Sequence, residues 1–276
     1  MSKNKISVFG ATGFIGSRFC ALSDLNCIKI KREDRLPKTN DSVYFISTTN
    51  NYHVFDDIKK DVNVNLLVLM EVLENFKYCD GIFNYISSWF VYGDVELPAT
   101  EDMCCRPKGF YSITKFAAEE MIISFCNTFG LKYRILRLCN VYGRGDSGVS
   151  KQKNALQYLI NQLRANEPIS LYYDGEFYRD YMHVDDISRA INLCIKKAPT
   201  NCILNIGTGE KILFRSIIEM ACELLDSSST INSIKPPVFH KIIQTKDFYM
   251  NIDKLNSTGF RPEIKLNEGI KELCQA

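Results

Sequence analysis

The chain has 276 residues, 46% of them hydrophobic and 24% charged, enough to bury one sizeable core with a smaller lobe attached. Its formal net charge of +2 argues against broad electrostatic binding to nucleic acid or to a membrane surface. No apolar run approaches the roughly 20 residues of a membrane-spanning helix, and the first ten residues lack the pattern of a secretory signal.

The cysteines and histidines indicate the compartment and the absence of a bound metal. Eleven cysteines occur at irregular spacing without a C-x-x-C pair, as expected of free thiols in a reducing environment. The three histidines, His53, His183 and His240, are far apart, and no pattern of metal ligands is recognisable. We therefore expect a cytoplasmic protein without a metal site and without nucleic acid or membrane partners.

Short runs rich in β-branched and aromatic residues alternate with helical patterns through the first half of the chain. This alternation predicts an α/β fold with a parallel sheet and helices on both faces. The expected strands are 5–9, 27–30, 42–47, 82–87 and 132–138, and the expected helices are 15–25, 61–77 and 111–129. The second half predicts a helix near 153–166, a strand at 169–173, a helix at 185–197, a strand at 202–206 and a helix near 266–274.

The stretch KISVFGATGFIGSRF, residues 5–19, places Gly10, Gly13 and Gly16 between an expected strand and an expected helix. Glycine lets the backbone approach an anion, and a helix start offers free N–H groups and the positive end of the helix dipole. The pattern predicts a phosphate-binding turn. An ordinary turn with incidental glycines is the alternative at this point.

A second motif lies in GFYSITKFAAEE, residues 109–120, where Tyr111 and Lys115 are four apart on one face of an expected helix. Tyrosine titrates near pKa ~10, but a neighbouring cation lowers that pKa and makes it a usable acid or base. Upstream, NYISSWFVYG ends a strand with Ser87 and Ser88, and a serine hydroxyl there can hold a substrate oxygen against the tyrosine. A packed tyrosine beside a solvated lysine is the alternative.

The motifs follow one another as G-x-x-G-x-x-G, S-S before V-Y-G, and Y-x-x-x-K. In this order the sequence resembles the extended short-chain dehydrogenase/reductase family, in its branch of nucleotide-sugar epimerases, dehydratases and reductases. The similarity continues through LRLCNVYGRGD (136–146), YDGEFYRDYMHVDDISRAI (173–191), NIGTGEKILF (205–214) and KLNSTGFRPEIKLNEGIKEL (254–273). It therefore covers nearly the whole chain.

The resemblance implies a Rossmann-type, doubly wound parallel sheet with a smaller C-terminal α/β lobe that binds the substrate. Residues 1–150 would form mainly the NAD(P)-binding domain and 151–276 mainly the substrate-binding lobe, with about 174–205 returning to the first domain. In many relatives the helix over 63–73 and the helix that carries Tyr111 form a dimer interface, so we expect a homodimer.

The resemblance also implies roles for individual residues. Tyr111 would be the catalytic acid/base, Lys115 would lower its pKa and bind the nicotinamide ribose, and Ser88 would be the catalytic serine. The turn that binds the dinucleotide would consist of Gly10, Thr12, Gly13, Phe14, Ile15 and Gly16. A nucleotide-diphosphate sugar would contact Ser88, Trp89, Asn140 and Arg179, with Asn140 at the sugar diphosphate and Arg179 at the nucleotide or its phosphates.

Three departures from the family narrow the expectation. Trp89 and Phe90 stand where 4,6-dehydratases carry an Asp-Glu pair that eliminates water, which argues against a dehydratase. Where many relatives grip the pyrophosphate with an arginine, this chain has QTKDF (244–248), so Lys246 or Arg144 would have to substitute.

The third departure concerns the cofactor. Lys31 and Arg32 stand at the end of the second strand, where NAD-specific members have an acid, and a basic pair suits the 2′-phosphate of NADP. NADP(H) is therefore favoured, while NAD(H) stays possible because Glu33 and Asp34 follow at once. We also expect the usual third strand and its helix to be shortened or missing, because little sequence separates this strand from the next.

Three functions fit these motifs. The first is a reductase that converts a 4-keto sugar nucleotide to its alcohol with NADPH. The second is a 4-epimerase that keeps NAD bound, oxidises the sugar and returns the hydride. The third, less favoured because Ser88, Tyr111 and Lys115 are all present, is a cofactor-sensing or scaffold protein without turnover.

Overall fold

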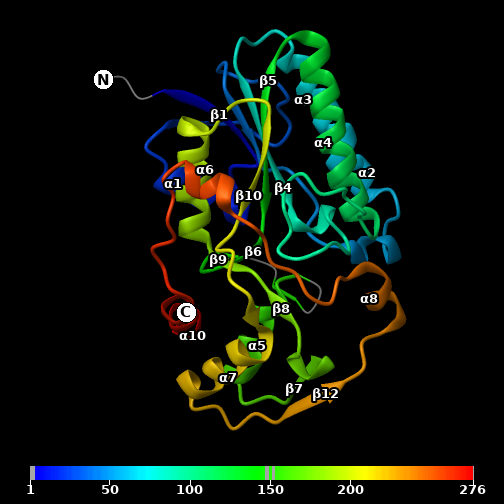
Figure 1. The fold of residues 1–276 in the computed structure, drawn as a ribbon, viewed down its shortest axis with the longest axis vertical. Helices are drawn as coiled ribbons and strands as arrows, with labels where there is room; N and C mark the ends of the chain where they lie inside the picture. Colours follow the sequence, from blue (N-terminus) through cyan, green and yellow to red (C-terminus); the bar gives the residue numbers. More distant parts are fainter. Residues whose placement is uncertain (1–3, 147–148, 151–152, 276) are drawn as a thin grey trace.

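A computed structural model describes residues 4–146, 149–150 and 153–275. Its centre is a sheet of six parallel strands in the order β10-β5-β4-β3-β1-β2 (Figure 1). The strands are β1 (Lys5–Phe9), β2 (Asn26–Lys29), β3 (Ser42–Tyr44), β4 (Ile82–Ser88), β5 (Lys132–Leu138) and β10 (Cys202–Ile206). The predicted α/β fold with a Rossmann-type parallel sheet is confirmed.

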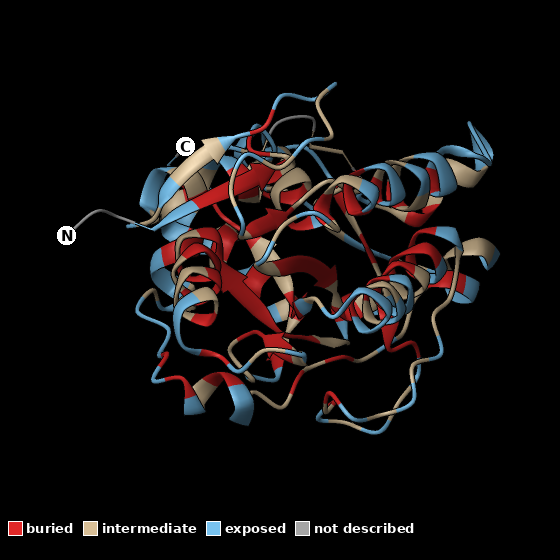
Figure 2. Ribbon diagram, turned by 90° about the horizontal axis from the view of Figure 1, so that it is seen from above, coloured by how far each residue is buried: buried red, intermediate tan, exposed pale blue. Residues whose placement is uncertain are grey.

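Helices cover both faces of the sheet. Successive side chains of each strand point to opposite faces, and apolar side chains on both faces are buried under helices. Val8 and Val43 pack under α1 (Phe14–Leu22) and α6 (Val184–Lys197), whereas Phe9 and Tyr44 pack under α3 (Val68–Phe76) and α4 (Phe110–Phe129). Figure 2 shows the strands as a buried layer between the helices. This double burial explains why the strand sequences are almost continuously apolar.

Helix α3 is preceded by α2 (Lys60–Val62) and by a π-helical turn, η2 (Asn63–Leu67). The sequence predicts a helix over 61–77, and the structure contains a continuous helical segment over 60–76 with a wider turn inside it. The extra residue of a π-turn rotates the side chains that follow, and such turns recur at functional sites. Asn65 is buried there.

The C-terminal half forms a second hydrophobic cluster below the sheet (Figure 1). The elements of this lower part are α5 (Ala155–Arg164), β7 (Ile169–Tyr172), η4 (Tyr173–Gly175), α7 (Phe214–Leu225), β12 (Ile231–Ile234), α8 (Val238–Ile243) and α10 (Leu266–Cys274). The expected elements at 153–166, 169–173 and 266–274 are present. Sequence analysis assigned no helix to α7, although its buried Phe214, Ile217, Ile218 and Ala221 recur at helical spacing.

Short strands connect the lower part to the sheet. β6 (Asn140–Tyr142) pairs with β9 (Tyr181–His183), and β8 (Tyr178–Arg179) pairs with β11 (Ile212–Leu213). Between them the chain forms α6, which packs on α1, and then β10, which pairs with β5. Two further short helices, η1 (Asn51–Phe55) and η3 (Trp89–Val91), follow β3 and β4, and α9 (Asp253–Ser257) precedes α10.

Strand β2 forms one edge of the sheet. Residues 30–41 run from β2 to β3 without a strand or helix among them. The structure therefore lacks the usual third strand and its helix between β2 and β3, as the sequence led us to expect. Among the described residues, no helix combines the length and the apolar character that crossing a membrane requires.

Candidate active site

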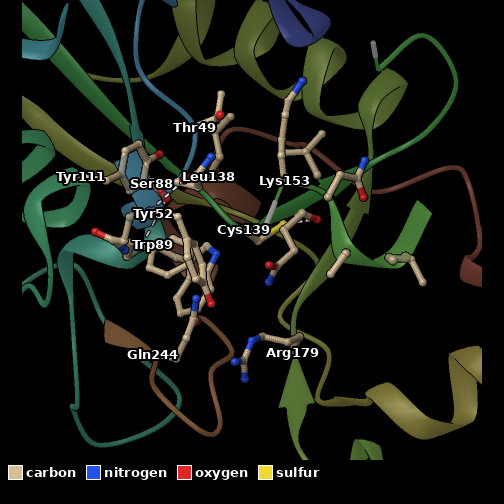
Figure 3. A pocket seen from close by; sticks show the side chains of 18 of the residues that line it. Thr49, Tyr52, Ser88, Trp89, Tyr111, Leu138, Cys139, Lys153, Arg179 and Gln244 are labelled. Carbon is tan, nitrogen blue, oxygen red and sulfur yellow. Dashed lines mark hydrogen bonds between the residues drawn. The ribbon is translucent and has the colours of Figure 1, made fainter. Parts of the chain in front are cut away.

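A large cleft opens at the carboxyl ends of the strands, where the strand order reverses between β1 and β3 (Figure 3). Open α/β sheets bind ligands at such a reversal, because the connections leave the sheet in opposite directions. The cleft has a volume of about 1130 Å³. Pockets for one small ligand measure roughly 300–1,000 Å³, so this cleft is larger than the usual space for one small ligand.

The glycine turn forms one end of the cleft. Gly10 has φ +77°, and a Cβ on Gly16 would lie 2.3 Å from the carbonyl oxygen of Gly10, so neither position accepts a larger residue without a shift. Helix α1 begins after Gly13 without a side-chain cap and without an acidic residue in its first turn. Its N–H groups are therefore available to an anion, and this cradle fits a dinucleotide pyrophosphate.

Five of the six residues predicted for this turn line the cleft: Gly10, Gly13, Phe14, Ile15 and Gly16. Thr12 lies in the turn but is exposed and outside the lining. Lys31 and Arg32 also lie outside the lining and are exposed. In the parallel pairing of β1 with β2, Val8 lies opposite Lys29. Two residues further along each strand direction come Gly10 and Lys31, so Lys31 lies at the same end of the sheet as the glycine turn.

Ser88, Tyr111 and Lys115 come together on one wall, from the end of β4 and the first turns of α4. Figure 3 shows Ser88 and Tyr111 side by side. Burial raises the pKa of Tyr111, and hydrogen bonds to the hydroxyls of Ser88 and Ser47 oppose that rise. The tyrosine is therefore protonated at neutral pH, which is the form that donates a proton.

Lys115 is buried one helical turn behind Tyr111. Its Nζ donates a hydrogen bond to the carbonyl oxygen of Ile86 at 2.6 Å and lies 4.1 Å from the ring centroid of Tyr85. Burial lowers the pKa of Lys115 to about 7, and the carboxylate of Glu119 acts in the opposite direction. The pKa of Lys115 is therefore close to neutral pH, so a small change in its surroundings changes the charge of the amine.

Glu119 continues the same helix face and forms an ion pair with Arg137 of β5. The Nη2 of Arg137 lies 2.7 Å from Oε2 of Glu119, and the exposed fractions of the two side chains are 3% and 0%. Ser87 donates a hydrogen bond to the same carboxylate, and the guanidinium of Arg137 lies over the ring of Tyr92. The pair therefore joins α4, β4 and β5 directly beneath the cleft.

Aromatic side chains form the wall that follows Ser88. The ring of Trp89 stacks between Phe90, at 4.1 Å, and Phe248, at 4.6 Å between centroids. The guanidinium of Arg179 lies 5.2 Å from the Trp89 ring. Trp89 and Phe90 both line the cleft, so the side chains next to Ser88 carry no acid or base.

Asn140 and Arg179 also line the cleft, but both are hydrogen-bonded to the main chain. Nδ2 of Asn140 donates to the carbonyl oxygen of Asp180 at 3.0 Å. Arg179 donates to the carbonyl oxygens of Tyr178 at 2.8 Å and Thr245 at 2.8 Å, and to that of Lys246. Its guanidinium thus holds the loop before Phe248 in place.

The two cations considered as substitutes for the missing arginine lie in different places. Lys246 lines the cleft together with Gln244. Arg144 lies in a separate hollow with Arg18, His183 and Asp185, where it is ion-paired with Glu272. Of the two, Lys246 is the one that can reach a ligand in the cleft.

Sequence analysis missed a polar network behind Tyr111. Asn65 of the π-turn accepts hydrogen bonds from Ser47 and the backbone of Thr48, and donates to the hydroxyls of Thr48 and Thr114. It also missed a bridge between Tyr52 and His240, whose Oη and Nδ1 are 3.0 Å apart at the mouth of the cleft. These contacts join elements distant in sequence, so no local pattern predicts them.

A parallel sheet with a glycine cradle at its reversal point, next to a serine, a tyrosine and a lysine, defines a dinucleotide-binding α/β enzyme. Residues 34–207 match the sequence model of the NAD dependent epimerase/dehydratase family, and the chain belongs to that family. Its curated relatives include epimerases, dehydratases and reductases of nucleotide sugars. Solved structures with this fold include complexes with NADPH as well as with NAD.

Individual relatives differ in their reactions. A putative UDP-glucose 4-epimerase of Methanocaldococcus jannaschii is 29% identical over 221 residues, covering 77% of this chain and 68% of the relative. The dTDP-4-dehydro-6-deoxyglucose reductase of Escherichia coli is 26% identical over 223 residues, covering 80% and 68%. The structure of UDP-glucose 4-epimerase from Thermotoga maritima with UDP-glucose has a TM-score of 0.86 at 23% identity, covering 98% of this chain and 97% of that one. The structural likeness establishes the fold.

The buried ion pair provides a test of the architecture beneath the cleft. Replacing Glu119 by Leu, or Arg137 by Met, leaves one charge buried without its partner and should lower the free energy of unfolding by about 3–5 kcal/mol. The double variant removes both charges and should recover most of that loss. Urea denaturation of the three variants measures the effect, and equal losses in single and double variants would contradict it.

Proposed function

We propose that the protein reduces the 4-keto group of a deoxysugar nucleotide, with NADPH as the source of the hydride. The observation that carries this proposal is the grouping of Ser88, a protonated Tyr111 and buried Lys115 beside the apolar pair Trp89 and Phe90. A reductase needs one proton donor and a neutral pocket around the sugar. A water-eliminating enzyme needs carboxyl groups in addition.

The proposed reaction uses these residues in simple roles. Reduced nicotinamide, when bound, supplies a hydride to the C4 carbon of the sugar. Ser88 donates a hydrogen bond to the keto oxygen and holds it against Tyr111, and Tyr111 transfers its phenolic proton to that oxygen. The charge of Lys115 stabilises the tyrosinate that this transfer leaves behind.

The acidic residues of the cleft support the exclusion of a dehydratase. Among the described lining residues these are Asp94 and Asp146, and each is ion-paired with a lysine, Lys108 and Lys153 respectively. Neither stands directly after Ser88, where Trp89 and Phe90 lie.

A 4-epimerase is the second candidate, because two of the relatives described above carry that name. An epimerase returns the hydride to the same sugar and therefore retains its dinucleotide through many turnovers. The open segment 30–41 beside β2 offers few elements to enclose an adenosine, and this favours an enzyme that exchanges its cofactor.

Replacing Tyr111 by Phe tests the reductase proposal directly. The variant keeps the ring and its packing but has no proton to donate, so kcat should fall by about 10²–10⁴-fold. The measurement is the loss of NADPH absorbance with a panel of 4-keto sugar nucleotides. Unchanged melting temperature and NADPH binding in the variant are the controls.

Two results would contradict this proposal. Turnover that survives in the Tyr111→Phe variant would remove the tyrosine from its role. Binding of NADPH and nucleotide sugars by the parent protein, without reduction or epimerisation of any substrate, would favour the non-catalytic sensor.

The cofactor preference can be tested separately. If Lys31 and Arg32 neutralise the 2′-phosphate, replacing both by Ala should weaken NADPH binding by about tenfold or more and leave NADH binding unchanged. Lys29→Ala removes a charge from the same strand further from the cradle and serves as the matched control. Calorimetric titration measures the affinities, and NAD retained through purification with no preference for NADPH would favour the epimerase.

We further propose that the protein is a homodimer through α2–α4. Apolar side chains with exposed fractions of 38% to 49% lie along these helices, namely Val62, Leu67, Met70, Ile113 and Met121. Leu69 and Leu73 of the same segment are buried, so only part of that apolar sequence serves the core. Exposed apolar side chains gathered on neighbouring helices are typical of an interface.

Light scattering should give twice the mass of one chain for the parent protein. The double variant Met70→Glu, Ile113→Glu should give the mass of one chain, because it buries like charges in the interface. Val238→Glu, on the exposed α8, is the control and should remain dimeric. A parent protein that is monomeric at high concentration would contradict the proposal.

A further inference from the structure

The turn η4 at the end of β7 holds three successive residues in left-handed backbone. The φ angles are 51° at Tyr173, 56° at Asp174 and 76° at Gly175. Glycine adopts this conformation freely and aspartate tolerates it, but a bulky aromatic residue rarely does. Backbone strain of this kind persists only where the surroundings impose it, and it concentrates at ligand sites.

Helix α7 holds this turn in place through Arg215. Arg215 of α7 is ion-paired with the carboxylate of Asp174 and also donates to its carbonyl oxygen at 3.3 Å. A Cβ on Gly175 would lie 3.1 Å from Cα of Arg215, and the N–H of Glu176 donates to the carbonyl oxygen of Tyr173 at 2.9 Å. None of these contacts uses the Tyr173 ring, so the ring is presented by the turn rather than required to build it.

The ring lies at the cleft. Tyr173 lines it with an exposed fraction of 41%, and Nζ of Lys246 is 5.9 Å from its ring centroid. This part of the cleft is built from α5, β7 and η4, and not from the elements that carry the glycine cradle. Lys246, which also lines the cleft, therefore places a cation beside the ring.

The order of groups along the cleft indicates which part of a substrate reaches this ring. The cradle after β1 takes the dinucleotide, and the sugar must touch Ser88 and Tyr111 to react. The nucleotide part of the substrate then extends away from the cradle, toward β7 and η4. A cation beside an aromatic ring at that end suits a diphosphate joined to a planar base.

We propose that Tyr173 stacks on the nucleobase of the nucleotide sugar and is a specificity-determining residue for that substrate class. This inference rests on the proposed function. The strained backbone directs the ring into the cleft, and Lys246 beside it lies toward the diphosphate of the same ligand. Stacking accepts any planar base, so Tyr173 favours nucleotide sugars over sugar phosphates that lack a base.

Calorimetric titration of the purified protein with UDP, dTDP, GDP and inorganic pyrophosphate tests this. Tyr173→Asn removes the ring and suits left-handed backbone, and it should weaken nucleoside diphosphate binding by about tenfold while pyrophosphate binding stays unchanged. Tyr173→Phe keeps the ring and should bind as the parent does. Tyr78→Asn, on a side chain exposed elsewhere, is the control.

The melting temperature separates a ligand role from a packing role. Tyr173→Asn should melt at the same temperature as the parent or a few degrees higher, because it relieves the left-handed strain. A lower melting temperature with unchanged nucleotide affinity would overturn the inference, as would equal losses for nucleoside diphosphates and pyrophosphate. A parent protein that binds none of the nucleoside diphosphates would instead overturn the proposed function.

Discussion

One buried ion pair fixes the helix that carries Tyr111 and Lys115. Glu119 lies one helical turn beyond Lys115 on the same face of α4, and Arg137 holds it from β5 with almost no access to water. The pair thereby sets the rotation of α4 about its own axis, and with it the direction of Tyr111. Ser87 donates a hydrogen bond to the same carboxylate and precedes Ser88, so the end of β4 that carries Ser88 and the helix that carries Tyr111 share one anchor.

The long elements of the sheet were predictable because each repeats one pattern over several residues. The expected strands 82–87 and 132–138 differ from β4 and β5 by at most one residue. Four short strands, β6, β8, β9 and β11, are two or three residues long and pair with distant segments. They are too short to show a periodic pattern in the sequence. Their pairing depends on how the lower cluster packs, which only the folded chain determines.

The same division applies to the cleft. The glycine cradle and the pair Tyr111 and Lys115 depend on spacing within one turn or one helix, and spacing is visible in a sequence. The hydrogen bonds of Asn65 and the bridge from Tyr52 to His240 join elements that are far apart in the chain. Nor does the sequence reveal that Arg179 is already bonded to three carbonyl oxygens, or that a tyrosine occupies left-handed backbone.

The position of β2 at the sheet edge has a consequence for association between molecules. An edge strand presents unpaired N–H and C=O groups, and another chain can add to them as a further strand. Here the edge is only four residues long, and Lys29 and Lys31 are exposed along it. Two such edges that approached each other would bring like charges together, so Lys29 and Lys31 keep the sheet from extending into a neighbouring molecule.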